Sequence, residues 1–161
     1  MHYILNYKIN CHKMLYQLKS SQGMSKHLEF EGEWATVSSA NLEPMLVSMG
    51  APFVVRKAAP RAKPVQKISF NDTGLKMKII TETVFSSNDS TIILDGSQFE
   101  SEMFGKKFVA TGMVCEDGSI VVNGKLGDLS VMIRREMSVD GQMVLVTTLP
   151  DIECTRVFNR K

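Results

Sequence analysis

The 161-residue sequence has few of the residues and motifs that catalysis, metal binding or disulfide formation require. It contains no HExxH, GxSxG, P-loop or dinucleotide-binding glycine pattern. The three histidines all lie in or beside the N-terminal segment: His2, His12 and His27. The three cysteines are odd in number and form no CxxC pair, which favours free thiols in a reducing compartment: Cys11, Cys115 and Cys154. We therefore expect no enzyme, no bound metal and no cofactor.

Long runs of one kind of residue are also absent. No run of lysine or arginine occurs, and the net charge is only +2, which argues against a nucleic-acid partner. The small positive charge still allows a weak attraction to anionic membrane surfaces. No stretch is long and apolar enough to span a membrane. The hydrophobic content of 43% is enough for one domain with a substantial core.

Residues 1–23 differ from the rest of the chain. They mix apolar residues with lysines, and they lack both the unbroken apolar core of a signal peptide and the arginines of a mitochondrial transit peptide. A short amphipathic helix is one interpretation. We favour an upstream extension with the functional start at Met24. The predicted division is therefore a poorly ordered extension over 1–27 and a folded domain over 28–161.

The remaining sequence predicts a mainly β fold. Alternation predicts a first strand over 30–37, and helical spacing then predicts two short helices. Asn41 is expected to cap the first helix, Gly50 to stop it, and Pro60 to end or bend the second. Strands follow with turn signals roughly every ten residues, which indicates a sandwich or an up-and-down barrel. Their predicted ranges are 66–70, 76–82, 90–94, 98–103, 107–113, 120–125, 129–137, 142–149 and 153–160.

Two of these strands carry an arginine among inward-facing residues. Strand side chains alternate, so Arg156 shares a face with Cys154 and Phe158. If Ile133 points inward, Arg135 does too. Two interior guanidiniums would need an anion between them, and a carboxylate fits their bidentate geometry. The alternative, a surface position near a strand end, stays open because arginine is seldom fully buried.

Several short motifs occur in order along 28–161. They are Phe30-x-Gly32-x-Trp34, Val37-Ser38-Ser39-x-Asn41, Gly50, Arg56-Lys57-Ala58, Lys63-Pro64, Arg135-Glu136 and Thr155-Arg156-Val157-Phe158. Together they resemble the intracellular lipid-binding protein family, which comprises fatty acid-binding proteins and cellular retinoid-binding proteins. The resemblance implies a ten-stranded antiparallel up-and-down β-barrel, or β-clam, capped by a helix-turn-helix. It also implies a non-enzymatic, monomeric carrier that holds a lipid inside the barrel.

The resemblance implies a ligand site as well. Arg135 and Arg156 match the arginines that bind the fatty acid carboxylate, while Phe158 stands where most fatty acid binders carry tyrosine. Phenylalanine at this position is similar to the retinol binders, but those carry glutamines where this chain has arginines. The family's portal phenylalanine corresponds to Phe85. The helix positions that face the cavity correspond to Leu42, Leu46 and Met49.

Arg56 and Lys57 match basic residues that in some members contact anionic membranes or belong to a nuclear-import signal. Val47 stands where the import signal has a further lysine, and a solvated helix face explains the two cations equally well. The expected function is a cytoplasmic carrier of long-chain fatty acids, with an additional nuclear location left open. A retinoid carrier and a membrane-surface lipid-docking protein are the alternatives.

Overall fold

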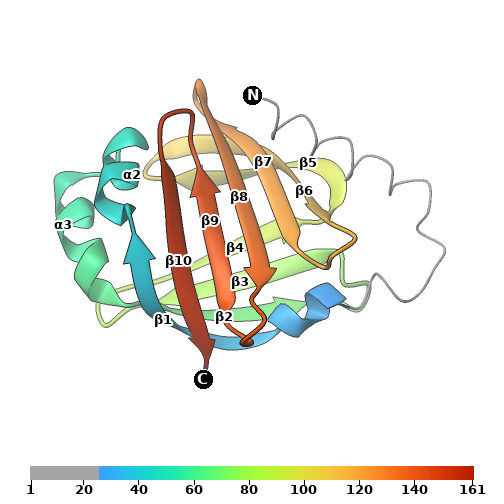
Figure 1. The fold of residues 1–161 in the computed structure, drawn as a ribbon. Helices are drawn as coiled ribbons and strands as arrows, with labels where there is room; N and C mark the ends of the chain where they lie inside the picture. The colour runs from blue at the N-terminus through green and yellow to red at the C-terminus, as the bar shows by residue number, and fades with distance from the viewer. Residues whose placement is uncertain (1–25) are drawn as a thin grey trace.

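The computed structural model describes residues 26–161 (Figure 1). The predicted extension lies outside the described residues except for Lys26 and His27. A 3-10 helix, η2 (Lys26–Phe30), precedes two α-helices, α2 (Leu42–Ser48) and α3 (Phe53–Ala62). The strands are β1 (Gly32–Ala40), β2 (Val65–Phe70), β3 (Lys76–Glu82), β4 (Ser87–Ile93), β5 (Asp95–Met103), β6 (Lys106–Val114), β7 (Ile120–Leu126), β8 (Leu129–Met137), β9 (Met143–Thr148) and β10 (Glu153–Arg160).

The ten strands form one antiparallel sheet in the order β4-β3-β2-β1-β10-β9-β8-β7-β6-β5. Sequential strands are neighbours, and β1 closes the circuit by pairing with both β2 and β10. β4 and β5 end the sheet without a ladder between them, so the barrel is nearly closed. Figure 1 shows α2 and α3 together at one end of the barrel. The predicted barrel with a helix-turn-helix cap is confirmed.

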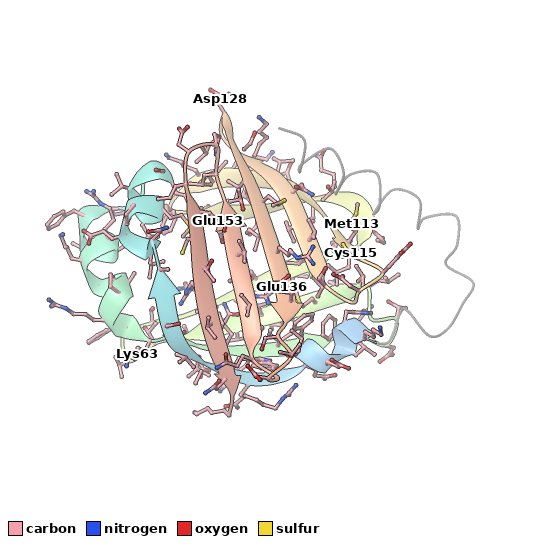
Figure 2. The ribbon with its side chains drawn as sticks, in the orientation of Figure 1. Lys63, Met113, Cys115, Asp128, Glu136 and Glu153 are labelled. Carbon is pink, nitrogen blue, oxygen red and sulfur yellow. The ribbon has the colours of Figure 1, made fainter. Side chains whose placement is uncertain are left out.

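The hydrophobic core lies in the barrel interior and continues under the helices. Trp34 and Phe158 are among its largest fully buried side chains, and Leu42, Leu46 and Met49 of the α2 segment belong to the same cluster. A smaller cluster, made by Cys115 and Val121 with Met113 and Met132, is separate from it. Figure 2 shows Met113 and Cys115 on the side of the molecule opposite the helices. The interior that the helices cover is therefore the main candidate for a site.

His27 belongs to this packed structure. Its side chain is 1% exposed, and its ring meets the ring of Phe70 edge-on at 5.3 Å between centroids. Its Nε2 lies 2.8 Å from the carbonyl oxygen of Gly74. A carbonyl only accepts, so Nε2 carries the proton and donates it. The η2 segment is thereby attached to the β2–β3 turn.

Several strand boundaries differ from the prediction: β4, for example, begins at Ser87 rather than at residue 90, and two further differences have a clear cause. The first strand runs from Gly32 to Ala40, because Phe30 ends η2 and Gly32 adopts a φ of 125°, which glycine permits. The strand predicted to begin at residue 98 begins at Asp95 instead. The Asp95-Gly96 pair is a bulge within β5 rather than a turn, so only Leu94 separates β4 from β5.

The helix ends also differ in part. Asn41 precedes α2 but does not cap it with its side chain; its backbone is left-handed, and its Nδ2 donates to the carbonyl of Glu153 at 2.9 Å. The second helix continues two residues past Pro60, so of the two predicted outcomes, an end or a bend, the end does not occur. Gly50 does stop the first helix: its amide donates to Val47, and that of Ala51 donates to Leu46, in a Schellman motif.

Candidate functional site

Arg135 and Arg156 lie in one row of residues across three adjacent strands. Arg135 on β8 is the register partner of Leu145 on β9, and Leu145 is also the partner of Arg156 on β10. All three side chains therefore share one face of the sheet, and the faces of Cys154 and Phe158 identify it as the interior. Alternation sends Arg134 outward, where it forms ion pairs with Asp117 at 2.7 Å and Glu136 at 2.6 Å. Figure 2 marks Glu136 on this strand.

Arg135 is almost completely enclosed, with 4% of its surface exposed. Its Nη2 donates to Oε1 of Gln66 at 3.1 Å, and its Nη1 lies 4.0 Å from the sulfur of Met77. Its Nε has no hydrogen-bond partner. Burial first, and then the nearby charge of Arg156, lower the pKa of Arg135 to about 10. Among residues 26–161, no carboxylate forms an ion pair that would compensate this cation.

Arg156 is less completely enclosed than Arg135 but has similar unpaired donors. Its guanidinium carbon lies 5.2 Å from the centroid of the Phe158 ring, and its Nε is buried without a partner. Burial lowers the pKa of Arg156 as well. Within residues 26–161, no carboxylate forms an ion pair with either arginine. The site therefore offers unpaired donors that match a carboxylate in charge and in geometry.

A cavity of about 570 Å³ connects Arg156 with the helical cap. It lies between the helix hairpin and β1 and contains both Arg156 and Leu42 in its wall. Its other lining residues are Thr36, Val37, Ser38, Ser39, Asn41, Glu43, Pro44, Ala59, Pro60, Lys63 and Pro64. Figure 2 marks Lys63, the residue that follows α3. Leu46 and Met49 do not line this cavity and pack in the main core instead.

Phe85 lies apart from the two arginines, in the β3–β4 turn. Its side chain is 89% exposed, and that of its neighbour Val84 is similarly exposed. The turn is held by Thr83, whose hydroxyl accepts from the amides of Phe85 and Ser86 at 3.2 and 3.0 Å. The gating role of Phe85 stays a prediction.

A second turn near the helices is attached to the helical cap. Lys106 Nζ, at the start of β6, donates to the carbonyl of Met49 at 3.4 Å.

The two basic residues of α3 have different partners. Lys57 Nζ contacts Glu43 at 2.6 Å and thereby joins α3 to α2; this hydrogen bond and charge lower the pKa of Glu43. The guanidinium carbon of Arg56 lies 5.6 Å from the centroid of the Phe53 ring. Phe53 and Val54 themselves are largely exposed, so apolar and basic side chains lie together on the outer surface of α3. No helix in the described residues 26–161 is long and apolar enough to cross a membrane.

Gln66 and Met77, the two contacts of Arg135, were not predicted from the sequence as site residues. Alternation along β2 could have placed Gln66 on the inner face, because it shares that face with Ile68. It could not have indicated which residue Gln66 meets, since Gln66 and Arg135 are 69 residues apart. Among residues 26–161, no group of three or more His, Cys, Asp and Glu side chains is placed to hold a metal ion.

Known proteins share this fold and sequence pattern, although no family model matches the chain. Fatty acid-binding protein 12 of Rattus norvegicus is 30% identical over 132 residues, which cover 82% of this chain and 97% of that protein. A fatty acid-binding protein of Clonorchis sinensis is 30% identical over 132 residues, covering 81% and 97%. The chain belongs to the fatty acid-binding protein family. The resemblance drawn from the motifs is thus confirmed.

A solved structure of this family shows the same architecture. A protein described as the REP1-NXSQ fatty acid transporter superposes with a TM-score of 0.75 at 27% identity, covering 83% of this chain and 97% of its own. Membership of the family therefore agrees with the observed barrel and its helical cap, and it places the chain among the lipid-binding proteins.

Proposed function

We infer that this protein is a non-enzymatic carrier that binds a long-chain fatty acid inside its barrel. The observation that supports this function best is the row formed by Arg135, Leu145 and Arg156, in which one buried and one partly buried cation have no ion-pair partner among residues 26–161. A ligand carboxylate would supply the missing charge and accept from both guanidiniums. The acyl chain would be stabilised by burial at about 25 cal/mol per Å² removed from water. Transport then consists of moving such a ligand through the cytoplasm.

The arginines also favour an acid over an alcohol. A retinol or fatty alcohol has no charge to offset the two interior cations, and truncating one partner of a buried charge pair costs about 2–5 kcal/mol. A retinoid carrier is the second candidate, because Phe158 provides a ring and no hydroxyl at the end of the site. In that case the arginines support retinoic acid rather than retinol as the ligand.

The proposal is tested by replacing one interior arginine. Arg156→Ala should weaken binding of oleic acid at least tenfold, a change of about 1.4 kcal/mol or more. It should weaken binding of oleyl alcohol much less. Arg134→Ala is the matched control, because it removes the same charge from the outer face of β8. Affinities are measured by calorimetry. Equal losses of acid and alcohol would mean that Arg156 shapes the barrel and does not recognise charge.

We also propose that the outer surface of α3 makes a transient contact with anionic membranes. Exposed Phe53 and Val54 beside Arg56 support it, because apolar side chains and cations together favour such surfaces. Binding to liposomes of anionic and of neutral lipid, in the absence of fatty acid, tests this contact. Equal retention by both kinds of liposome, or by neither, would argue against it.

A further inference from the structure

Gln66 and Arg135 are joined by a hydrogen bond that crosses the barrel. Gln66 lies on β2 beside Trp34, and Arg135 lies on β8. Three strands, β1, β10 and β9, separate β2 from β8 in the sheet, so the contact runs through the interior rather than along a ladder. Both side chains are buried, with 6% and 4% of their surfaces exposed. The bond therefore holds the guanidinium from the wall opposite its own strand.

The chemistry of the two groups sets the orientation of the amide. Arginine only donates hydrogen bonds, so Gln66 must present its oxygen to Arg135. The two N–H groups of the Gln66 amide nitrogen then point away from Arg135. They donate no hydrogen bond to another residue of the described part of the chain. Arg135 Nε also stays unpaired. Gln66 thus occupies one edge of the guanidinium and leaves donors available for a ligand.

The neutrality of Gln66 matters more than its hydrogen bond. An amide oxygen accepts from the guanidinium but carries no net charge, so the positive charge of Arg135 is left uncompensated. A carboxylate at the same position would form a buried ion pair with Arg135 and take the place that a ligand anion would fill. The same length of side chain could therefore either prepare the site for an acid or block it.

We propose that Gln66 sets the charge selectivity of the barrel interior at Arg135, by holding Arg135 in place for a ligand carboxylate without neutralising it. This inference rests on the proposed function, since it requires that an acid binds between Arg135 and Arg156. Gln66 is a positioning residue toward Arg135, and its free amide donors add a preference for an acceptor-only group. Phe158 brings no hydroxyl to the arginines, whereas Gln66 brings a neutral polar group to Arg135.

Two variants of equal length separate charge from hydrogen bonding. Gln66→Glu adds the negative charge, and Gln66→Met removes the amide while keeping an unbranched side chain. Gln98→Glu is the matched control, because Gln98 is exposed on β5 and the substitution changes the net charge equally. Each variant is tested for its affinity for oleic acid and oleyl alcohol by calorimetry, and for its melting temperature without ligand.

Gln66→Glu should lower oleic acid affinity at least tenfold, change oleyl alcohol affinity less than threefold, and raise the melting temperature of the empty protein through the internal ion pair. Gln66→Met should lower acid affinity by about threefold or more and lower that melting temperature, because Arg135 loses its acceptor. If wild type prefers oleic acid to oleyl alcohol and Gln66→Glu keeps that preference, this inference alone is overturned. If Gln66→Glu does not fold, the same preference kept by Gln66→Met overturns it. A wild-type protein that binds the alcohol as tightly as the acid overturns the proposed function, and this inference with it.

Discussion

The guanidinium of Arg156 lies against the ring of Phe158, with 5.2 Å between the guanidinium carbon and the ring centroid. Both residues come from β10, two positions apart, and therefore share the inner face. An aromatic face attracts a cation through its π electrons and has no oxygen that would accept a hydrogen bond from the guanidinium. Phe158 thus steadies Arg156 while leaving its donors for another partner. The ring also brings no hydroxyl to that partner.

The missing hydroxyl can be restored. Phe158→Tyr should tighten oleic acid binding by about 1 kcal/mol, or roughly fivefold, because one hydrogen bond is added beside two cations. Oleyl alcohol should gain less, since the added bond is stronger to a charged acceptor. Calorimetry with both ligands measures the difference. Unchanged or weaker acid binding would show that the ligand's head group does not reach residue 158.

The pKa of Arg135 predicts how binding depends on pH. Burial and the charge of Arg156 lower this pKa from its ordinary value to about 10 in the protein without ligand. Oleic acid affinity should therefore be flat from pH 8 to about pH 10 and decrease above it, as Arg135 loses its charge. Arg135→Gln should bind more weakly at neutral pH and lack this decrease. Arg134→Gln, changed on the outer face of the same strand, should keep the wild-type profile.

The same pKa shift has a consequence for folding, with the opposite sign. The unfolded chain binds the Arg135 proton more tightly than the folded protein does, so this group destabilises the empty protein most fully below pH 10. That penalty is relieved as the pH rises above about 10 toward the ordinary pKa of arginine. Urea unfolding of wild type and Arg135→Gln across this range isolates the contribution of this group. A constant difference between the two proteins would contradict the assignment.

Phe85 should affect ligand exchange more than stability. Its side chain is almost fully exposed, so Phe85→Ala removes little buried surface, while the turn itself is held by Thr83. Stopped-flow kinetics with a fluorescent fatty acid should show changed association and dissociation rates with a nearly unchanged melting temperature. Val139→Ala, at an equally exposed valine of the β8–β9 turn, is the control. Identical exchange kinetics in wild type and Phe85→Ala would argue against a gate here.

The N-terminal segment should be dispensable only up to a defined residue. Deleting residues 1–23 should leave stability and ligand affinity nearly unchanged, because the motifs of the barrel begin later. Deleting 1–27 should cost about 1–3 kcal/mol, since the hydrogen bond of His27 to Gly74 and its contact with Phe70 are lost. His27→Ala in the full chain should reproduce most of that loss in urea unfolding. A large loss from the first deletion would show that residues 1–23 stabilise the fold.

Local features of the sequence were sufficient for much of the fold. Alternation and closely spaced turns predicted consecutive antiparallel strands, because side-chain direction and turn type depend on a few neighbouring residues. Gly50 predicted the end of α2 for the same reason, since a left-handed residue is needed there. Alternation also predicted the inner face for Arg156, which lies between Cys154 and Phe158. Each of these features involves contacts only within a turn or along one strand.

Other features depended on where distant segments meet. Asn41 was expected to cap a helix, but closure of β1 onto β10 brings its side chain to the carbonyl of Glu153 instead. The bulge at Asp95 depends on how β5 pairs with β6. The Asp-Gly pair by itself indicated a turn.

The ligand site shows the same division most clearly. The sequence by itself determined that this chain carries two arginines on inward-facing strand positions. Only the tertiary structure decided that both lie opposite Leu145 and that Gln66 meets Arg135 across the barrel. Strand register and barrel closure bring these residues together, and both arise from pairing and packing over the whole sheet rather than from the residues nearby in the chain.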